Sequence, residues 1–129
     1  MEAVSVDSCF LIDIEKETAH SKLGPAVKLL KDLSSTKLFI SPTALGEFAV
    51  GFENESHSVL QLVISSFEIL RSSQSVSFEY ARLYRSMKSQ LIGANDLWIA
   101  AYSIVERLPL ITNNVREFRR VRGLEVVSY

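Results

Sequence analysis

Short apolar runs alternate along the chain with longer segments in which apolar residues recur every three or four positions. The short runs favour buried strands, and the longer pattern favours amphipathic helices. Strands are expected at residues 3–7, 38–40, 67–70, 108–111 and 124–127. Helices are expected at residues 8–15, 24–33, 41–52, 59–66, 76–91, 94–107 and 115–120. This alternation predicts an α/β fold, with a central, mainly parallel sheet of four to five strands flanked by helices on both faces.

Two of these helices carry stronger local signals than the rest. Ser41 and Pro42 are typical of an N-cap followed by the first helical residue, where the missing N–H of proline costs nothing. An apolar stripe from Leu45 to Phe52 follows at helical spacing, and we expect residues 59–66 to continue helical. Residues 94–107 are apolar nearly all round, which predicts a helix packed on several sides.

Length and composition indicate one folded domain over residues 1–129. The chain is 47% hydrophobic and 22% charged, which is ordinary for a globular domain and excludes a disordered chain. Cys9 is the single cysteine, so no internal disulfide can form, and a reducing compartment is favoured. No apolar run approaches the length of a membrane span, and no basic segment precedes an apolar stretch at the start. We therefore expect a cytoplasmic protein with no membrane partner.

The charge is nearly balanced but unevenly distributed. A net charge of −1 excludes a general polyanion binder. The second half of the chain is nonetheless basic, and Arg116, Arg119, Arg120 and Arg122 fall within seven residues. Charge alone leaves two interpretations open for this cluster, a solvated surface helix or a contact to phosphates.

Polar residues follow several of the predicted strands. Ligands of open α/β sheets bind beyond the carboxyl ends of the strands. Asp7 ends the first strand, Thr112 and Asn114 follow the strand at 108–111, and Asp96 lies in the first turn of the apolar helix. Glu47 lies on the helix after the second strand, away from its apolar stripe. Taken singly, Asp96 fits a helix-terminal acid, Glu47 a solvated residue and the asparagines a turn, whereas a buried Asp7 needs a partner.

Gathered at one edge, three carboxylates would repel one another and raise their own pKa values. A hard divalent cation such as Mg²⁺ or Mn²⁺ removes this repulsion and prefers carboxylate oxygens and water. Zinc is not favoured, because His20, His57 and Cys9 are scattered, and the two histidines fit surface positions. The chain also lacks a glycine-rich phosphate loop and a serine-nucleophile elbow, which excludes those two classes of hydrolase.

Four blocks of the sequence together resemble the PIN domain, and within it the VapC-type toxins of toxin–antitoxin modules. The resemblance runs essentially from end to end, with the blocks in the family's order and spacing. The blocks are VDS at 6–8, SPTALGEF at 41–48, IGANDLWIAA at 92–101, and LITNNVREF at 110–118 followed by VRGL at 121–124.

The resemblance implies a metal-dependent endoribonuclease that acts on structured RNA such as tRNA or rRNA, with Mg²⁺ or Mn²⁺ as cofactor. Asp7 and Asp96 would be the main metal ligands, and Glu47 would complete the acidic cluster. Ser8 would support Asp7 through its hydroxyl, and Thr112 and Asn114 would line the site. The arginines at 116, 119 and 120 would contact RNA phosphates. The implied partners are a small antitoxin, whose C-terminal segment would cross the acidic site, and a second copy of the chain in a dimer.

Two positions depart from the family pattern. Asn114 stands where many PIN domains carry a fourth acid, which weakens the expectation of a second metal. Cys9 replaces a polar residue that is common after the first aspartate. Two other functions are alternatives to this one. A catalytically silent PIN fold would bind RNA or protein, but such a function does not require that Asp7, Glu47 and Asp96 all be present. A receiver domain would need a second acid beside Asp7, a phosphorylatable aspartate after the third strand and a lysine after the fifth, which the sequence lacks.

Overall fold

The computed structural model describes residues 1–129 and contains five strands and seven helices. All four strand pairings are parallel, and the strand order in the sheet is β3-β2-β1-β4-β5. The predicted α/β architecture with a parallel sheet is confirmed. The elements in chain order are β1 (Ala3–Val6), α1 (Ser8–Ala19), α2 (Pro25–Asp32), β2 (Lys37–Ile40), α3 (Pro42–Ala49), α4 (Ser58–Ser66), β3 (Glu68–Ile69), α5 (Gln74–Ser86), α6 (Ala94–Val105), β4 (Leu110–Ile111), α7 (Val115–Phe118) and β5 (Val126–Val127).

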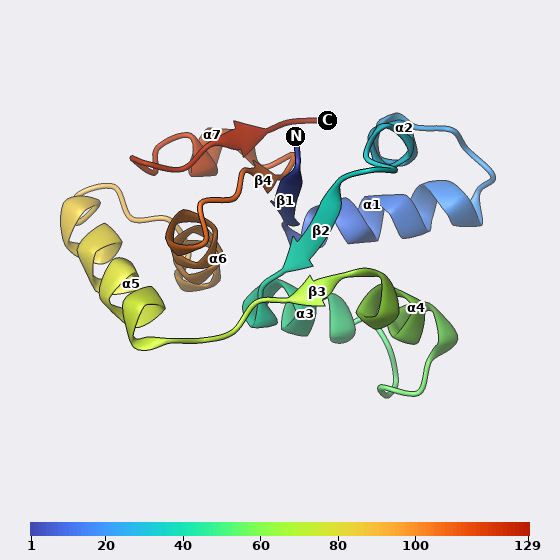
Figure 1. Ribbon diagram of the computed structural model, residues 1–129, viewed down its shortest axis with the longest axis horizontal. Coiled ribbons are helices and arrows are strands. Elements are labelled where there is room, and N and C mark those ends of the chain that lie inside the picture. Colours follow the sequence, from blue (N-terminus) through green and yellow to red (C-terminus); the bar gives the residue numbers. More distant parts are fainter.

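The sheet is narrow and its centre is buried. Val4 and Val6 of β1 and both residues of β4 have no exposed surface. Such continuous apolar strands are expected where helices cover both faces of a parallel sheet. Figure 1 shows this arrangement, with α1 and α2 on one side of the sheet and α5 and α6 on the other. None of the seven helices combines the length and the apolar composition that a bilayer crossing requires.

Helix α6 is the most deeply packed helix, as its sequence predicts. Its buried residues include Leu97, Ile99, Ala100 and Ala101, which lie around most of the helix circumference. One side packs on α5, where the rings of Tyr80 and Trp98 stack with centroids 4.0 Å apart. This packing fixes the direction in which the first turn of α6 points, and Asp96 lies in that turn.

Helix α3 begins where the sequence predicts and ends sooner. The Ser41 hydroxyl accepts a hydrogen bond from the Ala44 N–H, and Pro42 is the first helical residue. The helix ends at Ala49, so Phe52 lies beyond it and packs edge-on against Phe48 with ring centroids 5.1 Å apart. Residues 59–66 are helical as predicted and belong to α4, which turns at 50–57 separate from α3. The apolar spacing is kept by packing after the helical backbone has ended.

Other boundaries differ by up to five residues at several ends. Helix α1 continues past residue 15 to Ala19, because Lys16, Glu17 and Ala19 are good helix formers that carry no apolar signal. Helix α5 ends at Ser86 and α7 at Phe118, both before the predicted limits. Three strands have only two residues, β3, β4 and β5. The long strand predictions therefore included flanking loop residues whose side chains are apolar because they also pack on the core.

The order of the strands places one crevice at the carboxyl edge of the sheet. Strand β1 lies between β2 and β4, and the chain leaves β1 toward β2 but reaches β4 only after five further elements. Connections therefore run in opposite directions from the β1–β4 pair. Such a reversal opens a crevice beyond the carboxyl ends of the two strands, where α/β proteins bind ligands. Asp7 follows β1 at this point, and Thr112 follows β4.

Candidate active site

Asp7 is a buried carboxylate whose oxygens are all occupied by hydrogen-bond donors. It is 5% exposed and serves as the N-cap of α1. One oxygen accepts from the Ser8 N–H at 2.8 Å, and the other accepts from the Thr112 hydroxyl at 2.8 Å. These two donors fix the orientation of the Asp7 carboxylate at the end of β1.

Thr112 joins the two central strands at the site. It is fully buried, and besides donating to Asp7 its hydroxyl accepts from the Asn114 N–H at 3.0 Å. Asn114 in turn directs its side-chain amide toward the Asp96 carboxylate, at a long distance of 3.5 Å. The two residues predicted to line the site therefore both lie beside its aspartates.

The Cys9 thiol lies within the same cluster. Its sulfur is 3.4 Å from both an Asp7 oxygen and the Thr112 hydroxyl. Burial, and then the charge of Asp7, raise the pKa of the Cys9 thiol above its ordinary value. The thiol thus stays protonated and is able to donate to Asp7, so a hydrogen bond remains where the sequence departs from the family pattern.

Glu47 is held by two neutral donors from different parts of the chain. The Ser8 hydroxyl donates to one oxygen at 3.0 Å, and the Asn95 amide donates to the other at 3.2 Å. The expected partner of the Ser8 hydroxyl was Asp7, but only the backbone N–H of Ser8 contacts Asp7. Asn95 was not singled out from the sequence, although its position directly before Asp96 in the first turn of α6 places it at this edge.

Asp96 carries the clearest electrostatic signature of the site. Burial raises its pKa most, the charges of Asp7, Glu47 and Glu117 raise it further, and the value reaches about 6. Gly93, not Asp96, is the N-cap of α6, and no side chain caps this helix. Asp96 therefore faces the other carboxylates, and the interpretation of it as a mere helix-terminal acid does not account for its surroundings.

Glu117 is an acidic residue of the site that the sequence interpretation missed. It lies on α7 one turn beyond Asn114, and its charge acts on Asp96. Its carboxylate also accepts a hydrogen bond from Arg120 at 3.1 Å. Residues three apart share a helix face, so the spacing from Asn114 to Glu117 was the signal that could have identified it.

The arginines of α7 and the following turn have different environments. Arg120 is engaged by Glu117 and by the backbone carbonyl of Gln90. Arg116 and Arg119 are exposed and form no ion pair within the chain, and Arg122 is exposed as well. Of the arginines predicted to contact phosphates, Arg116 and Arg119 thus have the freer side chains.

The donor set at the edge suits a hard cation. The two ion pairs of the molecule are Arg82–Glu79 and Arg120–Glu117, so no basic side chain pairs with Asp7, Glu47 or Asp96. No group of three or more His, Cys, Asp or Glu side chains lies close enough to hold a metal by itself. Mg²⁺ is commonly bound by one or two carboxylates and keeps several waters, so Asp7 and Asp96 fit such an ion.

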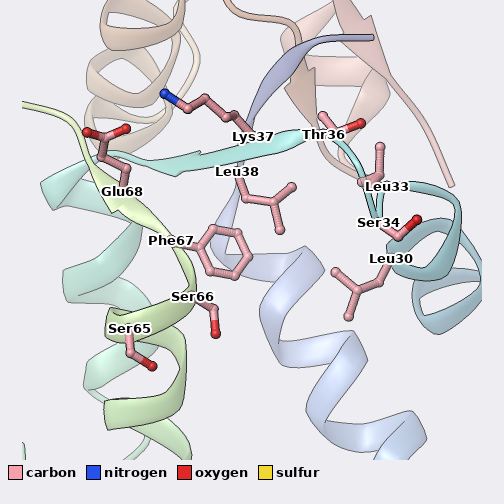
Figure 2. Close-up of a pocket in the computed structure, with 10 residues that line it drawn as sticks. All are labelled: Leu30, Leu33, Ser34, Thr36, Lys37, Leu38, Ser65, Ser66, Phe67 and Glu68. Carbon is pink, nitrogen blue, oxygen red and sulfur yellow. The ribbon is translucent and has the colours of Figure 1, made fainter.

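A hollow on the surface lies away from these acids. It has a volume of about 530 Å³ and is lined by residues of α2, β2, the end of α4 and the start of β3. In Figure 2 the side chains of Leu30, Leu38 and Phe67 point into it, and Glu68 is its only carboxylate. It therefore lacks the grouped acids that could carry hydrolytic chemistry, and the edge of the sheet at Asp7 and Asp96 is the candidate active site.

Comparison with known proteins identifies relatives of the whole fold. The PIN domain family matches residues 4–124. Ribonuclease VapC2 of Rickettsia felis is 35% identical over 92 residues, covering 66% of this chain and 69% of the relative. Ribonuclease VapC1 of Haemophilus influenzae strain R2866 is 32% identical over 91 residues, covering 67% and 68%.

Solved structures agree with this assignment. A VapBC-1 structure from nontypeable Haemophilus influenzae superposes with a TM-score of 0.74 at 25% identity, covering 98% of this chain and 97% of the other. The structure of VapBC2 from Rickettsia felis bound to a promoter DNA fragment superposes with a TM-score of 0.82 at 24% identity, covering 98% of each chain. The second likeness is one of fold, which is the fold predicted from the four sequence blocks.

Proposed function

The chain belongs to the PIN-domain family, and from this membership we propose that it is the toxin endoribonuclease of a toxin–antitoxin pair, hydrolysing phosphodiester bonds in structured RNA with Mg²⁺ or Mn²⁺. The curated relatives are ribonucleases, and the structure of highest identity among those compared above is a VapBC protein. The observation that carries the proposal is that the charges of Asp7, Glu47 and Glu117 all act on Asp96, and that Asp7, Glu47 and Asp96 have no basic partner.

The hydrogen bonds of each carboxylate suggest a different role for it in the reaction. Asp7 and Asp96 would hold the cation, and the cation would activate a water and offset charge on the phosphoryl oxygens when bound. Asp7 is fixed by the Ser8 N–H and the Thr112 hydroxyl, so it offers a preset oxygen geometry. Glu47 is oriented by Ser8 and Asn95 and is the carboxylate best placed to accept a proton from the attacking water.

Charge beside the acidic cluster supports RNA as substrate. Arg116 is exposed on α7, which begins directly after Asn114, and Arg119 is exposed at its C-cap. Their guanidinium groups would hold phosphates on either side of the scissile bond, a contribution that salt weakens. The same uncompensated carboxylates suit an arginine or lysine of the antitoxin, which would occupy the site and block it.

The deciding experiment is cleavage of total tRNA by purified protein freed of any antitoxin, with Mg²⁺, with Mn²⁺ and with EDTA. Asp96→Asn is compared with Glu106→Gln, which removes an exposed carboxylate at the opposite end of the same helix. We expect cleavage that needs the cation and Asp96 and is unaffected by the control. A folded wild-type protein that binds RNA but cleaves neither tRNA nor rRNA, with or without metal, would support the silent PIN-fold module.

A further inference from the structure

A hydrogen-bonded pair outside the acidic cluster reaches into the turn that carries Thr112 and Asn114. The Tyr129 hydroxyl donates to an oxygen of Asp13 at 2.6 Å. The side-chain amide of Asn113 donates to the same oxygen at 3.1 Å. Asp13 thus joins α1 to two segments that lie about a hundred residues further along the chain, the turn after β4 and the residues after β5.

The Tyr129 hydroxyl is a fixed donor. The ring is partly buried and packs edge-on against Phe10, with centroids 5.1 Å apart, and Phe10 is fully buried. Burial, and then the hydrogen bond with Asp13, raise the pKa of the Tyr129 phenol far above its usual range. The phenol therefore keeps its proton, and the ring packing aims it at Asp13.

Asn113 connects this pair to the site through its neighbours in the chain. Thr112 donates to Asp7, and the Asn114 N–H donates to the Thr112 hydroxyl. Asn114 then approaches Asp96. Because Asn113 lies between these two residues, the bond to Asp13 restricts a turn on which the contacts to both aspartates depend. Without this bond, the exposed side chain of Asn113 would be free to adopt several orientations.

The geometry points to Tyr129 and Asp13 as a positioning pair that fixes the turn at residues 112–114 in the shape that the acidic site needs. Neither residue touches the reacting atoms. Asp13 acts through Asn113, and Tyr129 acts through Asp13 and also lies beside the Cys9 thiol, which contacts Asp7 and Thr112. The structural part of this inference stands on the contacts alone, whereas its catalytic part rests on the ribonuclease activity proposed above. Strand pairing cannot replace the pair, because the backbone bond from Thr112 to Val127 ends the ladder one residue before Asn113.

Amide hydrogen exchange tests the structural part. In Tyr129→Phe the ring packing is kept and only the hydroxyl is lost. We expect the Asn114 N–H to exchange about fivefold faster, as for the loss of one hydrogen bond, while the Ala44 N–H at the start of α3 is unchanged. Tyr84→Phe removes a hydroxyl from an exposed tyrosine of α5 and should change neither amide. Equal exchange at Asn114 in all three proteins, or a parallel rise at Ala44, overturns the inference.

Kinetics test the catalytic part. Tyr129→Phe and Asp13→Ala are each expected to lower kcat about fivefold with KM for RNA unchanged, and the double variant to lower it no further than the stronger single variant. Additive losses, or an effect on KM alone, overturn the positioning role. If the wild-type protein does not cleave RNA, the proposed function fails, and hydrogen exchange still decides whether the pair holds the turn.

Discussion

Carboxylates are used in opposite ways at two places in this molecule, the acidic site and the corner between α1 and α2. At the corner, Glu17 accepts hydrogen bonds from the N–H groups of Ala26 and Val27, at 3.1 Å and 2.9 Å. These are free donors of the first turn of α2, whose N-cap Gly24 has no side chain to offer. At the site, Asp96 has three acidic neighbours and one long contact to an amide.

The charge of Glu17 is neutralised by the fold itself, whereas the charge of Asp96 is left for a bound ligand to neutralise. Glu17 satisfies backbone donors and gains from the positive end of the helix dipole, so its negative charge stabilises the folded state. Asp96 is half-buried among like charges, so its negative charge opposes folding until a cation arrives. A carboxylate that the fold does not neutralise is therefore the better marker of function.

The largest expected effect is on cleavage. Asp96→Asn should lower the rate of RNA cleavage by about a hundredfold or more, since it removes a charge that the transition state requires. Glu17→Gln, the matched change at the corner, should leave the rate per folded molecule within about twofold. The measurement is single-turnover cleavage of a labelled tRNA at saturating Mg²⁺. Equal losses in both variants would erase the distinction between the two regions.

Stability should respond in the reverse order. Glu17→Ala removes both acceptors from the start of α2 and should lower the free energy of unfolding by about 1–2 kcal/mol, as for the loss of a helix cap. Asp96→Asn should leave that free energy unchanged or raise it in the absence of divalent cations. Urea unfolding in EDTA, followed by circular dichroism, checks both. A destabilised Asp96→Asn protein would show that this carboxylate has a structural role after all.

The pH dependence of stability should reveal Asp96 directly. Because its pKa rises from 3.8 to about 6 on folding, the folded state holds a proton that the unfolded state releases. This contribution is complete below pH 4 and is lost as the pH rises to about 6. Its size should be about 1 kcal/mol, since solvent screens a half-exposed group. Unfolding in EDTA from pH 4 to pH 7 should show the loss in the wild-type protein and not in Asp96→Asn.

The smallest expected effect is on stability, from a substitution at Gly24 that displaces the Glu17 carboxylate. A Cβ at Gly24 would lie 2.4 Å from the Glu17 carboxyl carbon, so Gly24→Ala must push that carboxylate aside. We expect a loss of about 0.5–1 kcal/mol in the wild-type background, comparable to a weakened cap. In the Glu17→Ala background the same substitution should cost nothing. An equal cost in both backgrounds, measured by a double-mutant cycle in urea, would place the effect in the backbone instead.

The sequence predicted those helices and strands that hydrophobic periodicity and helix caps determine. It also predicted the position of the aspartates that belong to the family motifs. Ser41 capped its helix as expected, and Asp7 and Asp96 lie at the expected edge. The end of α3 was predicted three residues too late, because Phe52 keeps helical spacing through packing on Phe48. Periodicity reports which side chains are buried, and it does not report whether the backbone between them is helical.

The polar contacts of the site were less predictable. In the sequence, Asn95 looks like a solvated residue at the start of a helix, and Glu117 like one on a short helix. Only the tertiary structure brings Asn95 to Glu47 and Glu117 close to Asp96. The Ser8 hydroxyl reaches Glu47 because α3 lies beside the start of α1, a fact of packing between helices. Hydrogen-bond partners depend on distances of a few tenths of an ångström, which spacing along a chain does not fix.

The pairing of β1 with β4 also sets the moment at which activity can arise. In this register Ser5 lies beside Leu110, so more than a hundred residues must be made before the two strands can meet. The hydrogen bond from Thr112 to Asp7 forms only after Thr112 has been synthesised, and Glu117 is synthesised later still. During synthesis, an N-terminal portion of the chain can pair β1 with β2 but lacks a complete set of acids. A nascent chain therefore lacks a complete site until the residues through Glu117 have left the ribosome.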